Sequence, residues 1–173
     1  ERLARSDARL KVLRGERRGV VHAANLALSQ AQAPFIARMD ADDECAPTRL
    51  QVSLAALQAD PELCGVGTQL EVFRDDRPVS PNLQAHAQWL NSLTTTEALY
   101  ADRLVESPLC NPGITLRRAA IDGWREGDFP EDWELFLRIL QTGKLTCLTG
   151  PPLVRWRDHD RRLTRTDARY ARE

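Results

Sequence analysis

Residues 34–50 constrain the fold of this chain more than any other stretch. A short apolar run is followed by Asp40, Asp42 and Asp43, and then by the start of a helix with Pro47 in its first turn. This order indicates a buried strand that ends in an Asp-x-Asp pair and is followed by a helix. In open α/β sheets, ligands bind in the crevice at the carboxyl ends of the strands. We therefore expect these carboxylates to line such a crevice.

We considered several interpretations of this acidic motif. Two carboxylates one residue apart can share a hard divalent cation, which prefers oxygen ligands and often retains substrate phosphates in its shell. An EF-hand calcium loop would need a glycine at its sixth position, where Cys45 stands. A phosphatase with an aspartyl nucleophile would need Thr or Val in place of Glu44. A solvated acidic turn that ends a strand and begins a helix is the simplest alternative.

Strand-like and helix-like patterns alternate along the chain, as they do in βαβ units. The segments are a strand at 10–13, a helix at 19–32, the Asp-x-Asp strand at 35–39, a helix at 47–59, strands at 64–73 and 144–148, and one or two helices within 84–106. We therefore predict an α/β fold with a mainly parallel central sheet and helices on both faces. The strands Leu10–Leu13 and Phe35–Met39 are expected to be neighbours.

The composition is that of a soluble globular protein, since 42% of the residues are hydrophobic and 28% are charged. A formal net charge of -1 argues against a nucleic-acid-binding module, which would be basic. The four cysteines form no Cys-x-x-Cys pair, so we expect reduced thiols and no zinc site. No apolar run approaches the ~18 residues of a membrane span. The expected location is the cytoplasm, including the inner face of the membrane as a peripheral site.

A second acidic group lies in the segment Phe129–Arg138. Pro130, Glu131 and Asp132 begin an amphipathic helix. Acids in the first turn of a helix complement its macrodipole, which is the simple explanation for them. A carboxylate within reach of a hydroxyl can instead act as a general base.

The run ARMDADDECAPTRLQ, residues 37–51, resembles the signature of the family 2 glycosyltransferases, which have the GT-A fold. Weaker similarities accompany it over about Leu10 to Tyr170. They are Gly19, Asn25 and Ala33 around the first helix, the segment Cys110–Arg118 with Asn111 where the family more often has His, the ED-x-x-L-x-x-R pattern at Glu131–Arg138, the Trp-Arg-x-His pattern that ends at His159, and the basic RLTR of residues 162–165.

The resemblance implies an inverting glycosyltransferase that moves a sugar from a nucleotide-diphosphate-sugar donor to a saccharide, lipid-linked or protein acceptor. Asp40, Asp42 and His159 would hold Mn²⁺ or Mg²⁺, and Asp132 would be the general base with Glu131 beside it. The residues expected to bind the donor are Arg38, Asp40, Asn25, Arg157 and Arg165.

The expected organisation is a single partial catalytic domain over residues 1–173, with a metal and donor half at about 10–75 and an acceptor and base half at about 76–173. The nucleotide-binding βαβ unit that precedes these motifs in the family has no counterpart in this sequence. We therefore expect the chain alone to self-associate and to lack detectable transferase activity. The alternative function is a non-catalytic scaffold or binding module that retains only the metal site.

Overall fold

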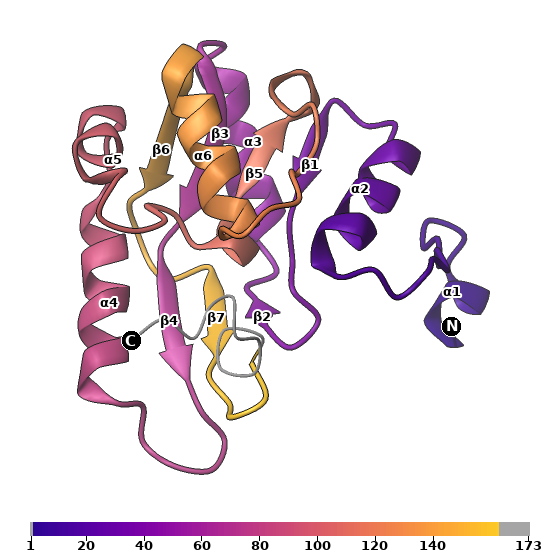
Figure 1. The fold of residues 1–173 in the computed structure, drawn as a ribbon, viewed down its shortest axis with the longest axis horizontal. Coiled ribbons are helices and arrows are strands. Elements are labelled where there is room, and N and C mark those ends of the chain that lie inside the picture. Colours follow the sequence, from indigo (N-terminus) through magenta and orange to yellow (C-terminus); the bar gives the residue numbers. More distant parts are fainter. Residues whose placement is uncertain (1, 163–173) are drawn as a thin grey trace.

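The computed structural model describes residues 2–162 (Figure 1). Its elements in chain order are α1 (Arg2–Ser6), α2 (Val20–Gln30), β1 (Phe35–Ala37), β2 (Glu44–Cys45), α3 (Arg49–Ala59), β3 (Leu63–Thr68), β4 (Leu70–Phe73), α4 (Pro81–Ser92), α5 (Thr96–Asp102), η1 (Asn111–Gly113), β5 (Thr115–Arg117), η2 (Arg118–Ala120), α6 (Glu131–Thr142), β6 (Lys144–Leu148) and β7 (Val154–Arg157).

The strands form one sheet in the order β1-β5-β3-β6 and a second in the order β2-β7-β4. Strand β5 runs antiparallel to β1 and to β3, and β2 is antiparallel to β7, whereas β3–β6 and β4–β7 are parallel pairs. The predicted α/β class is confirmed, but the strand directions are mixed rather than mainly parallel. The parallel pair β3–β6 is joined by a long connection that contains α6, as parallel pairing requires, and β5 lies between β1 and β3 in the opposite direction.

The prediction of a strand at Leu10–Leu13 was wrong. This stretch has no strand structure, and Leu10, Val12 and Leu13 are 47%, 51% and 40% exposed. Within residues 2–162, β1 is bonded only to β5, so its other edge has no partner strand. An apolar pattern produces a strand only where a neighbouring strand takes up its backbone hydrogen bonds and its side chains are packed.

The four-stranded sheet carries a helix on each face, as predicted. Phe35 of β1 packs with Leu57 of α3, whereas the next residue, Ile36, packs into the cluster formed by α6. Because successive side chains of a strand point to opposite faces, the two helices cover opposite sides. Helix α6 contributes Leu135, Phe136, Ile139 and Leu140 to the larger cluster.

The strand predicted at 64–73 is two strands, β3 and β4, which belong to different sheets and meet at Gln69. The backbone carbonyl of Gln69 accepts hydrogen bonds from the N–H groups of Leu153 and Val154. Its side-chain amide donates to the carbonyl of Asn91 at 3.0 Å. Strand β4 therefore turns away to join β7, and β7 in turn pairs with β2 beside the acidic turn.

The helical stretch predicted within 84–106 is two helices, α4 and α5. Ser80 Oγ accepts a hydrogen bond from the N–H of Leu83, and Thr95 Oγ1 accepts one from the N–H of Ala98. These side chains satisfy N–H groups that have no partner inside the first turn of each helix. None of the described helices is both long enough and apolar enough to cross a bilayer.

Candidate active site

The acidic turn begins where β1 ends. The N–H of Arg38 donates to the carbonyl of Ile114 at 3.0 Å, so pairing with the neighbouring strand continues one residue beyond Ala37. The N–H of Asp43 donates to the carbonyl of Asp40 at 3.3 Å and closes the turn. Pairing of β2 with β7 then places the turn next to residues 157–159.

Asp42 and His159, both predicted to bind metal, lie together in the structure. Asp42 Oδ2 and His159 Nε2 are 2.9 Å apart, and this hydrogen bond is the main reason why the pKa of Asp42 is below its ordinary value. Asp40 is not part of the pair, because its Oδ1 accepts a hydrogen bond from Arg38 Nε at 3.0 Å. Within residues 2–162, no three His, Cys, Asp or Glu side chains are grouped closely enough to hold an ion. Two donors suited to a hard cation are thus in place, and Asp40 would have to leave Arg38 to add a third.

Arg157 fixes the acidic turn from the side of β7. Its N–H donates to Asp43 Oδ1 at 2.8 Å, its Nε to the carbonyl of Asp42 at 2.7 Å, and its Nη2 to Glu44 Oε1 at 3.0 Å. Its Nη1 forms an ion pair with Asp75. The guanidinium is therefore engaged inside the protein, which gives no support to its predicted contact with a diphosphate.

Burial, opposed by the hydrogen bond from the Arg157 N–H and assisted by the charges of Asp42 and Asp40, raises the pKa of Asp43 to about 6. The three carboxylates of the turn therefore act on one another electrostatically. Such a concentration of negative charge favours the arrival of a cation.

Asp132 lies in the first turn of α6. Burial of its carboxyl group, and then the charge of Glu131, raise the pKa of Asp132 to about 6, while Arg38 acts in the opposite direction. Asp132 Oδ1 accepts a hydrogen bond from the N–H of Trp133 at 2.8 Å. Glu131 is buried.

The acids of the turn and of α6 converge around Cys110 and Arg38. Burial raises the pKa of the Cys110 thiol, and Asp43, Asp40 and Asp132 add to this effect. Arg38 pairs with Asp40 and also lowers the pKa of Asp132. The two acidic segments therefore act electrostatically on the same residues.

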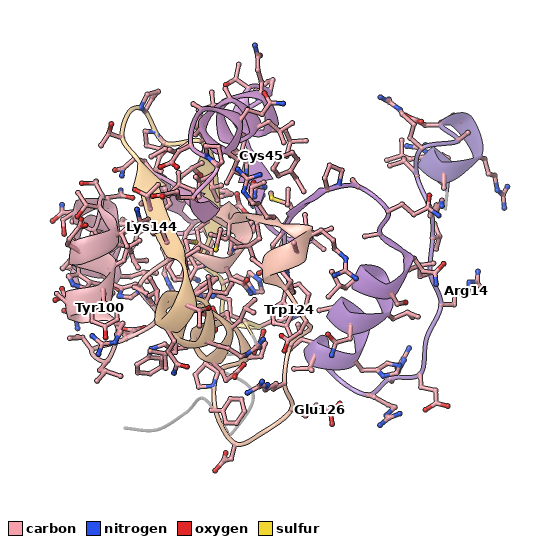
Figure 2. The ribbon with its side chains drawn as sticks, turned by 90° about the horizontal axis from the view of Figure 1, so that it is seen from above. Arg14, Cys45, Tyr100, Trp124, Glu126 and Lys144 are labelled. Carbon is pink, nitrogen blue, oxygen red and sulfur yellow. The ribbon has the colours of Figure 1, made fainter. Side chains whose placement is uncertain are left out.

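Asn25, predicted to bind the donor, joins helix α2 to the backbone of Trp124. Its Nδ2 donates to the Trp124 carbonyl at 2.8 Å, and its Oδ1 accepts from the Trp124 N–H at 2.9 Å. Figure 2 shows Trp124 between α2 and the rest of the domain. The guanidinium of Arg38 lies 5.8 Å from the centre of the Trp124 ring. The amide of Asn25 is therefore used to attach α2 to the backbone of Trp124.

Two cavities border α2. One, of about 280 Å³, lies between α2 and residues 118–125, and the other, of about 350 Å³, lies between α2 and residues 11–16. Neither is lined by Asp40, Asp42 or Asp132. The acidic site is instead reached from the surface, since the side chains of Asp40 and Asp42 are 36% and 47% exposed.

Three further arginines bear on the site, one predicted and two noticed only in the structure. Arg165 lies outside the described residues. Arg162, which the sequence pattern placed only in a basic tail, lowers the pKa values of Asp42 and Asp43 and lies 4.1 Å from the Trp156 ring centre. Arg49 was missed as a functional candidate, although a cation at the start of a helix is unfavourable and could have been noticed on that ground.

The Glycosyl transferase family 2 profile matches residues 1–124. The chain belongs to this family. The acidic turn lies inside the matched range, and the α6 segment that carries Asp132 lies beyond it. No curated protein matches the chain at a significant level.

Solved glycosyltransferase structures share the fold. The mannosyltransferase PcManGT from Pyrobaculum calidifontis, in complex with GDP-Man and Mn²⁺, is 21% identical with a TM-score of 0.60, over 91% of this chain and 42% of that chain. Residues 1–349 of TarS from S. aureus are 14% identical with a TM-score of 0.57, over 84% of this chain and 42% of that chain. The TarS complex with UDP-GlcNAc is 14% identical with a TM-score of 0.52, over 78% and 38%. The predicted GT-A fold is thereby confirmed, and the chain spans about two fifths of each of these structures.

Proposed function

We propose that this family 2 glycosyltransferase domain transfers a sugar from a nucleotide-sugar to an acceptor hydroxyl, with inversion at the anomeric carbon and with help from a divalent cation. The observation that carries the proposal is the convergence of Asp40, Asp43 and Asp132 around Cys110, with Arg38 acting on Asp40 and on Asp132. The donor class is supported by the GDP-Man and UDP-GlcNAc complexes of the structures that share the fold.

Asp42 and His159 are the residues proposed to hold the cation, with Asp40 joining them. A bound cation supplies Lewis-acid stabilisation of the charge that develops on the leaving diphosphate. Arg38 pairs with Asp40 in the structure and could exchange this partner for a phosphate oxygen, to which guanidinium binds well.

Asp132 is proposed to take the proton of the acceptor hydroxyl. The hydroxyl oxygen then bonds to the anomeric carbon while the bond from that carbon to the diphosphate breaks. A pKa of about 6 keeps Asp132 ionised at neutral pH and makes it a stronger base than an ordinary aspartate. The N–H of Trp133 holds Oδ1, which fixes the direction of the carboxylate.

Binding and turnover by the whole chain test the proposal. UDP-sugars and GDP-sugars are titrated with and without Mn²⁺, and transfer to a panel of hydroxyl acceptors is measured in the same samples. We expect donor binding to depend on Mn²⁺. Asp42→Asn should abolish this dependence on Mn²⁺. Glu71→Gln should leave it unchanged, because Glu71 is an exposed acid of β4.

Where transfer is measurable, Asp132→Asn should keep donor binding and lose ~10²–10⁴ in rate. Glu126→Gln is the control, since Glu126 is an exposed acid that precedes α6. Mn²⁺ binding without any binding of a nucleotide-sugar would favour the alternative, a non-catalytic module that retains only the metal site.

A further inference from the structure

Arg49, the first residue of α3, is buried without a carboxylate partner. It is 2% exposed, and within residues 2–162 no ion pair involves its guanidinium. Removing a cation from water is costly, and its position at the positive end of a helix adds to the cost. An apolar side chain would fill this space at a lower cost, so the guanidinium itself needs an explanation.

The hydrogen bonds of Arg49 explain why a guanidinium is needed at this position. Its Nη2 donates to the carbonyl of Arg38 at 2.7 Å and to the carbonyl of Ile114 at 3.1 Å, and its Nη1 donates to Met39 Sδ at 3.4 Å. The Ile114 carbonyl also accepts the N–H of Arg38. One side chain thus ties the last paired residue of β1 to the segment that leads into β5.

The same residue closes the acidic turn from its other end. The backbone N–H of Arg49 donates to the carbonyl of Ala46 at 3.0 Å, and the N–H of Ala46 donates to Leu153 at 2.9 Å. The Arg49 side chain therefore holds residues 38 and 39 before the acids, and residue 46 after them is held by the Arg49 N–H and by the carbonyl of Leu153.

We propose that Arg49 is a positioning residue that holds the turn Asp40–Asp43 in the geometry needed to bind a divalent cation. This inference rests on the proposed function as far as the cation is concerned. The mechanical part, fixing the turn through the carbonyls of residues 38 and 114, does not depend on it.

Arg117 provides a matched control. It is a half-buried arginine whose guanidinium likewise donates to backbone carbonyls, with Nε donating to Leu63 at 2.8 Å and Nη2 to Asp60 at 3.2 Å and to Leu57. These carbonyls lie at the end of α3 and the start of β3, away from the acids. Lysine at either position keeps the charge but removes the planar fork of donors.

The test compares Arg49→Lys with Arg117→Lys. In Arg49→Lys, hydrogen exchange of the amides of Asp43 and Ala46 should become faster by about tenfold or more, while exchange at Leu63 is unchanged. Arg117→Lys should show the opposite pattern. Electron paramagnetic resonance of added Mn²⁺ should show an affinity reduced about 10–100-fold in Arg49→Lys and unchanged in Arg117→Lys, as for other residues that orient ligands. Arg49→Gln replaces Arg49→Lys if the latter does not fold.

Equal acceleration of exchange in both regions would mean that Arg49 only supports overall stability, and would overturn the proposal. Unchanged exchange at Asp43 and Ala46 would do so as well. If the unaltered chain binds no Mn²⁺, the proposed metal dependence fails, and the exchange comparison still decides whether Arg49 positions the turn.

Discussion

Burial of the Asp132 carboxyl group makes the stability of the domain depend on pH. The folded-state pKa of about 6 lies above the ordinary value of 3.8, so ionisation is penalised in the folded state. The penalty is absent below pH of about 4 and complete above about 6. Asp132→Asn removes it and keeps an oxygen for the Trp133 N–H. At pH 7.5 the variant should be more stable by about 1–3 kcal/mol, and at pH 4 the two proteins should be equal.

Thermal unfolding at both pH values measures this difference. Asp75→Asn is the control, because the Asp75 side chain is 69% exposed. A variant that gains nothing at pH 7.5 would show that the Asp132 carboxyl keeps an ordinary pKa, and its role as a strong base would lose support.

Two aspartates that share Arg74 should differ in their importance. Asp158 Oδ2 lies 2.8 Å from Arg74 Nη1, and both side chains are almost completely buried, whereas Asp160 pairs with the same guanidinium at 3.2 Å and is 63% exposed. Arg74 also pairs with Asp76, whose side chain is 60% exposed. Removal of Asp158 takes away the single buried carboxylate of this group, whereas an exposed pair contributes little. Asp158→Asn should therefore lower the unfolding temperature clearly more than Asp160→Asn. Equal effects would contradict the assignment of Asp158 as the buried anchor of the segment that carries His159.

At this scale, the sequence supplied candidates for the site but not their partners. Asp40, Asp42, Asp132 and His159 were selected because their motifs resemble those of family 2 glycosyltransferases, and their roles stay predictions. The partners of Arg157 could not be predicted, since all four of these contacts are with residues more than 80 positions away in the chain.

At the scale of elements, the attachment of helix α2 to the rest of the domain depends on the Asn25 side chain. Leu28 is its single buried residue, and Asn25 adds two hydrogen bonds to the backbone of Trp124. Gly123 beside it has φ of 128°, and a Cβ there would lie 3.0 Å from Asn25 Oδ1. Asn25→Ala should therefore loosen α2, lower stability by about 1–3 kcal/mol and change the fluorescence of Trp124.

Ser29→Ala is the matched control for Asn25→Ala. Ser29 lies on the same helix, and its hydroxyl bonds only to the carbonyl of Leu26 within that helix. If both variants lost the same stability, the connection to Trp124 would not be what holds α2 in place.

Elements with strong local patterns could be predicted from the sequence, and those that depend on partners could not. Helix α6 has acids in its first turn and a regular apolar face, so its start and its amphipathic character could be predicted. The division of residues 64–73 into β3 and β4 is caused by bonds from Leu153 and Val154, which no local pattern reveals. The direction of β5 is likewise set by its neighbours in the sheet.

At the scale of the whole molecule, the edge of β1 that has no partner strand among residues 2–162 and the exposed segment before α2 are expected to favour self-association. Exposed strand edges offer unpaired backbone groups to other chains, and Leu10, Val12 and Leu13 add apolar surface next to α2. Sedimentation should show a mass that rises with concentration, as expected from the sequence. The triple change Leu10→Ser, Val12→Lys and Leu13→Ser should reduce it.

Leu104→Ser with Val105→Ser is the control for that experiment. These two residues are 69% and 70% exposed, and they lie beyond α5 rather than in the segment before α2. A chain that stays monomeric at all concentrations would refute the prediction. If the control substitutions reduced self-association as much as the triple change, the association would have to involve another surface.

The pairing of β2 with β7 also determines at which stage of synthesis and folding the site can form. Asp42 and His159 are 117 residues apart in the chain, and Asp43 is 114 residues from Arg157. Contacts across such long loops form late, because the entropy of closing the loop is lost before they are gained. During synthesis the acidic turn therefore leaves the ribosome long before the histidine and arginine that complete it. Until then the neighbouring carboxylates repel one another without compensation, so an assembled site marks a chain that has been translated through β7.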